Sequence, residues 1–285
     1  MDKATVMAPS IRVGIGGWTF EPWRSNFYPA AWPHGRELEY ASHRLTAIEI
    51  NSTYYSSQKP ATFAKWRDQT PDDFMFSLKA SRFATNRRVL GEAGESVQRF
   101  VTSGIAELAH KLGPIVWQFA PTKRFDPVDF EVFVKLLPTQ VGGLALRHVL
   151  DVRHDSFKCT EYLALARRLA VATVFTDSDE HPAFADLTGG FVYARMMRTD
   201  ASLPEGCTPQ AFDQLGACAR CWREGSEPAG LPRVEAAPAP APLTAPRLPK
   251  LPTSLTPPRD VFMFFIGGAK EKAPAAAMAL LQRLR

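Results

Sequence analysis

The chain alternates short apolar runs with longer segments in which apolar residues recur at helical spacing. The short runs are rich in β-branched and aromatic residues, as buried strands are, and cover residues 12–17, 46–51, 74–79, 115–119, 148–153, 172–177, 191–195 and 261–266. Helical segments fit between them at residues 60–69, 94–112, 126–137, 160–169, 208–223 and 273–284. In the fifth of these, Thr208 is a favourable N-cap and Pro209 suits the first helical position.

Strands that alternate with helices predict a parallel sheet with right-handed crossovers, and eight strands are the number that closes a barrel. We therefore expect an α/β fold, a TIM-type (β/α) barrel of eight parallel strands that occupies residues 1–285 as a single domain. An open doubly wound sheet is also compatible with the pattern. No sequence repeat indicates a solenoid.

One segment, residues 225–258, departs from this alternation. It is rich in proline and alanine, lacks the apolar density of a packed core and favours extended backbone. It lies between the last two predicted strands, so we interpret it as an insertion in the barrel that acts as a surface spacer. A proline-rich docking motif is the alternative.

Polar residues stand near the C-terminal ends of several otherwise apolar strands, often two positions apart. Residues two apart share one face of a strand, and unpaired charge is costly to bury there. In a barrel these side chains would converge at one mouth, where TIM-barrel active sites lie. The set comprises Glu49, Asn51, Ser77, Lys79, Gln118, Asp151, Arg153, Asp177, Tyr193 and Arg195.

The charges in this set indicate the kind of ligand. Lys79, Arg153 and Arg195 supply cations, and arginine forks suit phosphate or carboxylate groups. We expect a small anionic ligand, with Glu49 or Asp151 as the general acid or base. The alternative is a structural network in which these two carboxylates only neutralise the neighbouring cations.

Further candidate chemistry is sparse. His154 is the histidine best placed to shuttle a proton, although a positioning role is an alternative. Carboxylates near the strand ends could bind a metal ion, but no H-x-x-x-H or comparable histidine cluster stands there, so we predict no metal site. Cys218 and Cys221 form a single C-x-x-C pair, which is weak evidence for zinc and is more typical of ordinary helix cysteines. No cofactor is assigned.

The first loop, residues 16–29, combines glycines with two Trp, two Phe and one Tyr. It is not G-x-G-x-x-G, so the dinucleotide-binding fingerprint is absent. Its aromatic residues could stack on a sugar or a base, or they could plug the loop onto its own barrel. We favour the plug.

Composition sets outer bounds. The formal net charge of +5 permits an acidic partner without requiring one. No run of 18 apolar residues exists, so we expect no membrane span, and MDKATVMAPS lacks the apolar core of a signal peptide. The expectation is therefore a cytoplasmic protein with reduced thiols, in an oligomeric state that the sequence does not indicate.

Several linked motifs carry a family resemblance. They are Gly16-Gly-Trp-Thr-Phe20 with Trp23 and Phe27-Tyr-Pro29, Glu49-Ile-Asn-Ser-Thr-Tyr-Tyr55, Trp66 with residues 70–80, Lys111-Leu-Gly-Pro114, Gln118-Phe-Ala-Pro121 and Asp151-Val-Arg-His154. With these motifs the chain resembles the YecE-like family, also called domain of unknown function 72. The resemblance implies a TIM-like barrel and no established activity.

Two departures from that family pattern concern the last strands. Met197-Arg198 stand where the family usually has His-Gly, and Ile266-Gly267-Gly268 stand where it usually has asparagines. The resemblance therefore implies an altered far side of the mouth.

Three functions remain open from the sequence. The first is an enzyme, a hydrolase, isomerase or lyase, for a small anionic substrate. The second is a nucleic-acid binding or processing protein, supported by Arg82, Arg87 and Arg88 and by aromatic residues that could stack on bases. The third is a non-catalytic scaffold that uses the proline-rich segment.

Overall fold

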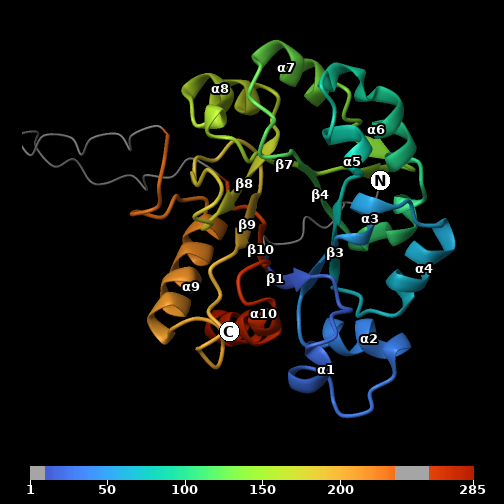
Figure 1. Cartoon of the computed structure of the whole chain (residues 1–285), viewed down its shortest axis with the longest axis vertical. Coiled ribbons are helices and arrows are strands. Elements are labelled where there is room, and N and C mark those ends of the chain that lie inside the picture. Colours follow the sequence, from blue (N-terminus) through green and yellow to red (C-terminus); the bar gives the residue numbers. More distant parts are fainter. Residues whose placement is uncertain (1–9, 235–256) are drawn as a thin grey trace, which may run out of the picture.

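Parallel strands close into a barrel with the helices outside it, as Figure 1 shows. The structure is a computed structural model that describes residues 10–234 and 257–285. Around the barrel the strand order is β1-β10-β9-β8-β7-β4-β3-β2. The eight strands are β1 (Ile11–Gly16), β2 (Ala47–Ile50), β3 (Met75–Lys79), β4 (Leu112–Gln118), β7 (His148–Asp151), β8 (Ala172–Thr176), β9 (Val192–Met196) and β10 (Val261–Phe265). The predicted barrel is confirmed, and the open sheet is excluded because β1 pairs with both β2 and β10.

Helices connect these strands and cover the outside of the barrel (Figure 1). The larger ones are α2 (Glu37–Ser42), α4 (Pro60–Asp68), α6 (Gly94–Val101), α7 (Pro127–Lys135), α8 (Thr160–Arg168), α9 (Pro209–Arg223) and α10 (Ala273–Leu284). Single turns form α1 (Trp23–Asn26), α3 (Ser52–Tyr55) and α5 (Arg82–Thr85). The Thr208 hydroxyl accepts from the backbone N–H of Ala211 at 3.2 Å, which confirms the predicted N-cap of α9.

One predicted helix was too long. Residues 94–112 were expected to form one helix, but α6 ends at Val101 and a separate 3₁₀ segment, Ile105–Lys111, leads into β4. Gly104 lies in this break: its φ of 112° is in the left-handed region, where a helix does not continue, and a Cβ there would lie 2.7 Å from the Pro60 Cα. The short hairpin of β5 (Gln140–Val141) and β6 (Leu144–Ala145) was also not anticipated. Most of the proline-rich segment, residues 235–256, lies outside the described residues.

Two apolar cores lie on the two sides of the strand ring. The larger one fills the space between strands and helices, and includes Trp117 and Trp222. The smaller one fills the inside of the barrel with side chains from every barrel strand except β1, and it comprises Ala47, Met75, Val116, Val149, Ala172, Val174, Phe191, Tyr193, Phe262, Phe264 and Ile266. Inward residues recur every second position along a strand. On several strands, the inward position that follows the apolar one therefore lies nearer the C-terminal mouth of the barrel.

β1 contributes glycine where the other strands contribute side chains. A Cβ at Gly14 would lie 2.0 Å from the backbone oxygen of Ala47 and 3.2 Å from the ring of Phe264. We predict that Gly14→Ala lowers the free energy of unfolding by about 1–3 kcal/mol, because the added methyl group forces the β1–β2 backbones apart. Urea denaturation followed by circular dichroism measures this change.

Gly35→Ala is the matched control, since a Cβ there has no neighbour within 4 Å. It should leave the unfolding midpoint nearly unchanged or raise it slightly. Equal stability of the two variants would show that the close approach of β1 and β2 is not what requires glycine.

Candidate functional site

Polar side chains replace apolar ones at the inward positions nearest the C-terminal mouth of the barrel. Along β2 the inward residues run from Ala47 to Glu49, and along β7 from Val149 to Asp151. On β9, Tyr193 is followed two positions later by Arg195. The strand register sets Gln118 beside Asp151 and Glu49 beside Ser77. Alternation along each strand thus stacks a polar layer on the apolar floor.

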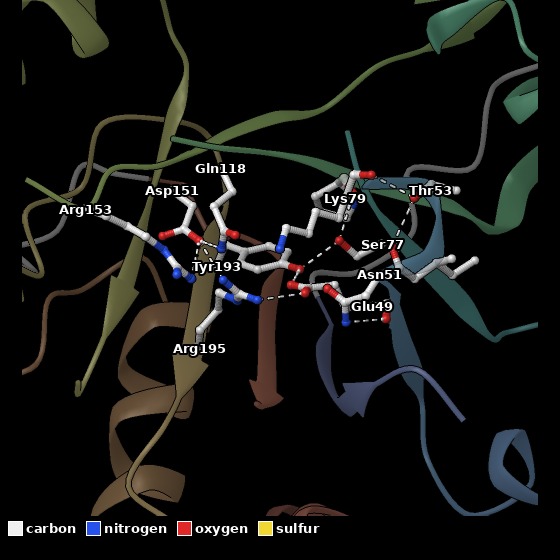
Figure 2. Close-up of polar contacts among 12 residues, drawn as sticks. Glu49, Asn51, Thr53, Ser77, Lys79, Gln118, Asp151, Arg153, Tyr193 and Arg195 are labelled. Carbon is white, nitrogen blue, oxygen red and sulfur yellow. Dashed lines mark hydrogen bonds and ion pairs between the residues drawn. The ribbon is translucent and has the colours of Figure 1, made fainter. Parts of the chain in front are cut away.

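Arg195 joins two buried carboxylates across the barrel (Figure 2). Its guanidinium donates to Glu49 Oε1 at 2.9 Å and to Asp151 Oδ2 at 2.5 Å. Glu49 is fully buried, and the other two side chains are nearly so. β9 is separated from β2 by two strands and from β7 by one, so only closure of the barrel brings the three charges together.

Further donors bind the two carboxylates. The Tyr193 hydroxyl donates to Glu49 Oε2 at 2.7 Å, and the Ser77 hydroxyl lies 2.7 Å from that of Tyr193. Gln118 Nε2 donates to Asp151 Oδ2 at 2.5 Å. Arg153 adds a longer bond, 3.2 Å, to the same oxygen. Each carboxylate is therefore held by Arg195 together with at least one neutral donor.

The pKa shifts follow from burial and from this pairing. Burial alone would raise the pKa of Asp151, but Arg195 and Arg153 outweigh it and hold that pKa below its usual value. Burial would likewise lower the pKa of Arg195, but Glu49 and Asp151 raise it above its usual value. Burial and the neighbouring Glu49 raise the pKa of Tyr193 well above that of a free tyrosine. Asp151 and Arg195 therefore stay charged, and Tyr193 stays protonated, across the physiological pH range.

Lys79 differs from its neighbours because no carboxylate contacts it. Its ammonium lies 4.1 Å from the centroid of the Tyr54 ring, and within the described part of the chain no hydrogen bond or ion pair to it is present. Burial, with Arg195 the next largest cause, lowers the pKa of Lys79 to about 8. Lys79 is thus the group of this site whose charge changes closest to neutral pH.

A cavity of about 580 Å³ opens above the polar layer. Its polar lining residues include Asn51, Ser52, Lys79, Gln118, Arg153, Arg195 and Lys270. Trp18, Tyr55 and Ile266 supply apolar wall. Four of the lining residues are cationic, and none of the lining residues from the described ranges is Asp or Glu. The cavity therefore presents positive charge, while the balancing carboxylates lie beneath it.

The structure thus separates the predicted site residues into two layers. Asn51, Lys79, Gln118, Arg153 and Arg195 line the cavity. The two proposed acid–base residues, Glu49 and Asp151, form the layer below together with Tyr193.

Two predicted residues lie apart from this cluster. Asp177 accepts from the backbone N–H of Met197 at 2.5 Å, and burial raises its pKa. His154 accepts from the backbone N–H of Ser156 through Nδ1 at 3.1 Å and so caps the turn that follows β7. Neither residue lines the cavity, and a proton-shuttle role for His154 remains a prediction.

The first loop is mostly the plug that we favoured. Trp23, Phe27 and Tyr28 are buried, and the Trp23 indole N–H donates to the backbone oxygen of Lys270. Trp18 and Trp23 both border the cavity as well, so part of this loop also forms cavity wall. Sequence reasoning missed Lys270 because it follows β10 by five residues, in a loop without a strand pattern to mark it.

Residues that follow β9 and β10 form one side of the cavity wall. Met197 and Gly267 both border the cavity, and Gly267 adopts a φ of 96°. A Cβ at Gly267 would lie 3.0 Å from the end of the Met197 side chain. The wall is apolar and closely packed at these two positions, and Lys270 adds a cation beside it. That this side departs from the family pattern stays a prediction from the sequence.

The two cysteines of the C-x-x-C pair, Cys218 and Cys221, both lie on α9, as predicted for helix cysteines. Burial raises the pKa of both thiols. Within the described ranges no group of three or more His, Cys, Asp or Glu residues has metal-binding geometry. None of the helices there combines the length and apolarity needed to cross a bilayer.

Comparison with known proteins agrees with the resemblance seen in the sequence. The YecE protein (UPF0759) of Escherichia coli strain K12 is 30% identical over 119 residues, which is 42% of this chain and 42% of that protein. The chain therefore matches less than half the length of this curated relative.

Solved structures show the same fold over almost the whole chain. A DUF72 family protein of Thermotoga maritima, TM1631, superposes with a TM-score of 0.69 at 18% identity, covering 96% of this chain and 98% of that one. A DUF72 family protein of Enterococcus faecalis, EF0366, gives a TM-score of 0.65 at 14% identity and covers 96% and 95%. The family described as "Protein of unknown function DUF72" has a model that matches residues 12–285. The chain therefore belongs to the DUF72 family.

Proposed function

We propose that the cavity at the C-terminal mouth binds a small ligand that carries a phosphate or carboxylate group. The observation that supports this is the lining, in which four cations and no carboxylate face the cavity among the described residues. Its volume of about 580 Å³ is in the range of small-molecule sites. A cavity with one sign of charge and low-dielectric walls attracts ligands of the opposite sign.

The donors of this cavity are only partly used by the protein itself. Lys79 has no acceptor within the described part of the chain, and Arg153 makes one long bond to Asp151. The Nε atoms of Arg153 and Arg195 are buried, and neither has a hydrogen-bond partner in the ranges that the structure covers. Unmet buried donors are costly, so an anion that accepted from them would be stabilised.

We assign the proton-transfer role in this site to Lys79 and positioning roles to Glu49 and Asp151. Lys79 borders the cavity and has a pKa near 8, which suits an acid or base at cellular pH. Both carboxylates face Arg195 instead, so they fix the guanidinium that faces the ligand. An amine beside bound anionic substrate is compatible with isomerase, lyase or hydrolase chemistry.

Loss of the positive charge of either Arg153 or Lys79 should weaken anion binding. We predict that Arg153→Met and Lys79→Met each raise the Kd for orthophosphate roughly ten- to hundredfold, the equivalent of about 1.5–3 kcal/mol for a hydrogen bond to a charged group. Isothermal titration calorimetry at low ionic strength measures this.

Arg99→Met is the matched control, because Arg99 is an exposed arginine on α6 that pairs with Glu95. It should leave the Kd within about twofold. A wild-type protein that binds neither orthophosphate nor small carboxylates more tightly than chloride would overturn the proposed function.

Anion binding should also depend on pH through Lys79. Sulfate is a suitable probe because its own charge is constant above pH 4. We predict constant affinity below about pH 7 and falling affinity as pH rises through the Lys79 pKa of about 8, since the ammonium is lost. A bound anion favours the charged form of the Lys79 amine. The pKa of Lys79 should therefore be higher in the sulfate complex than in the free protein.

Two variants separate Lys79 from other titrating groups. Lys79→Met should bind sulfate weakly with a flat profile, and Lys79→Arg should keep tighter binding with a flat profile up to pH 9.5. If Lys79→Met retained the wild-type break, another group would be responsible and the role of Lys79 would be refuted.

A further inference from the structure

A second basic pocket lies on the same rim, between the loops that follow β3 and β4. Its volume is about 590 Å³. Thr85, Asn86, Arg87 and Arg88 form one wall, and Ala120, Thr122, Lys123 and Arg124 form the other. The sequence had singled out Arg87 and Arg88, but Lys123 and Arg124 join them only in the folded chain.

The positive charge of this pocket is mostly uncompensated. Lys123 pairs with Asp129 at 3.0 Å, and Arg87 uses neutral acceptors, the backbone oxygen of Phe83 and the hydroxyl of Ser96. Arg88 and Arg124 are exposed, and their guanidinium groups form no hydrogen bond or ion pair within the described residues. Among the described residues, these three arginines of one surface therefore have no carboxylate partner to neutralise them.

A buried hydroxyl in the same wall also lacks a partner. Thr85 is 1% exposed, and its Oγ1 has no hydrogen-bond partner among the residues that the structure describes. Buried polar atoms are usually satisfied, so an unpartnered one in the wall of a pocket indicates a missing ligand or water. This observation is independent of the arginine cluster.

One tyrosine links this pocket to the central cavity. The Tyr54 ring carries the Lys79 ammonium on its face, and its hydroxyl accepts from Asn86 Nδ2 at 3.4 Å. Lys79 lines the central cavity and Asn86 lines the second pocket. The Tyr54 side chain therefore contacts one lining residue of each basic site.

Exposed aromatic rings flank the same stretch of surface. Tyr55, which also lines the central cavity, is 62% exposed, and Phe83 on α5 is 60% exposed. The Arg82 guanidinium lies 5.9 Å and 5.5 Å from the centroids of these two rings. These rings can pack against an uncharged part of a ligand, beside its anionic groups.

We infer that the pocket of Thr85, Arg87, Arg88 and Arg124 binds a second phosphate group of the ligand whose first anionic group occupies the central cavity. The inference rests on the proposed function and extends it: the ligand carries at least two phosphate groups. Arginine forks and a hydroxyl donor are the groups that phosphate oxygens accept from. The two sources of such chemistry are a polyphosphorylated small molecule and a phosphodiester chain.

The test compares orthophosphate with tripolyphosphate by isothermal titration calorimetry on the full chain. Because two linked sites act together, wild-type protein should bind tripolyphosphate at least about tenfold more tightly than orthophosphate. Arg88→Met/Arg124→Met should lose this advantage, while orthophosphate binding that depends on Lys79 stays within about twofold. Thr85→Val should reduce the advantage without altering the charge.

Arg99→Met/Lys135→Met is the control for loss of two positive charges, since both residues are exposed on helices and pair with glutamates. It should preserve the advantage of tripolyphosphate. If the advantage is absent in wild-type protein, or survives in Arg88→Met/Arg124→Met, the inference is overturned. A different result would overturn the proposed function instead: wild-type protein that shows no orthophosphate binding of the kind that Lys79→Met abolishes.

Single-stranded oligothymidylate identifies the source of the phosphate groups. If the ligand is a phosphodiester chain, Arg88→Met/Arg124→Met should also weaken oligothymidylate binding. The log–log salt slope should then fall by about 0.7 for each cation removed. Weakened tripolyphosphate binding with no measurable oligothymidylate binding supports the second pocket and assigns it to a small polyphosphorylated molecule.

Discussion

The bridge that Arg195 makes between Glu49 and Asp151 is the interaction on which the site depends. All three charges are buried, and each would cost several kcal/mol if left without its partner. Their geometry is therefore strongly coupled to closure of the barrel, because β9, β7 and β2 must hold them at bonding distance at once. Tyr193 donates to the second oxygen of Glu49, and Gln118 donates to the same Asp151 oxygen as Arg195, so both carboxylates are held by more than one donor.

Side-chain length explains why the cavity is basic although the polar layer contains both signs. The carboxylates end close to the strands, while longer lysine and arginine side chains extend past them to the cavity. Arg195 is neutralised from below, but Lys79 is not, and the energetic cost of that arrangement is visible in its lowered pKa. Buried ion pairs can have a purely structural role. Here Lys79 is a cation without a carboxylate partner, which supports the proposal that this site binds an anion.

The far side of the mouth is built by residues that follow the barrel strands. Met197 and Gly267 make an apolar wall after β9 and β10, and Lys270 supplies a cation from the following loop. The barrel that carries them has the family fold, with a TM-score of 0.69 to the Thermotoga maritima protein at 18% identity. Loops after barrel strands can vary without loss of the barrel because the strands carry most of the packing.

The sequence by itself determined the eight strands, most of the helices and the polar strand ends, because periodicity and buried polarity are local signals that each strand carries alone. Gly104 shows the limit of periodicity: the apolar spacing continues across it, but its left-handed φ of 112°, beside Pro60, is incompatible with one continuous helix. Only the tertiary structure decided which predicted residues face the cavity. Glu49 and Lys79 look equivalent in the sequence, because both are charged residues near a strand end. In the structure Glu49 lies beneath the cavity, bonded to Arg195, while Lys79 lines the cavity. Burial depth and the reach of Arg195 across the barrel decide this difference, and both depend on contacts between distant strands.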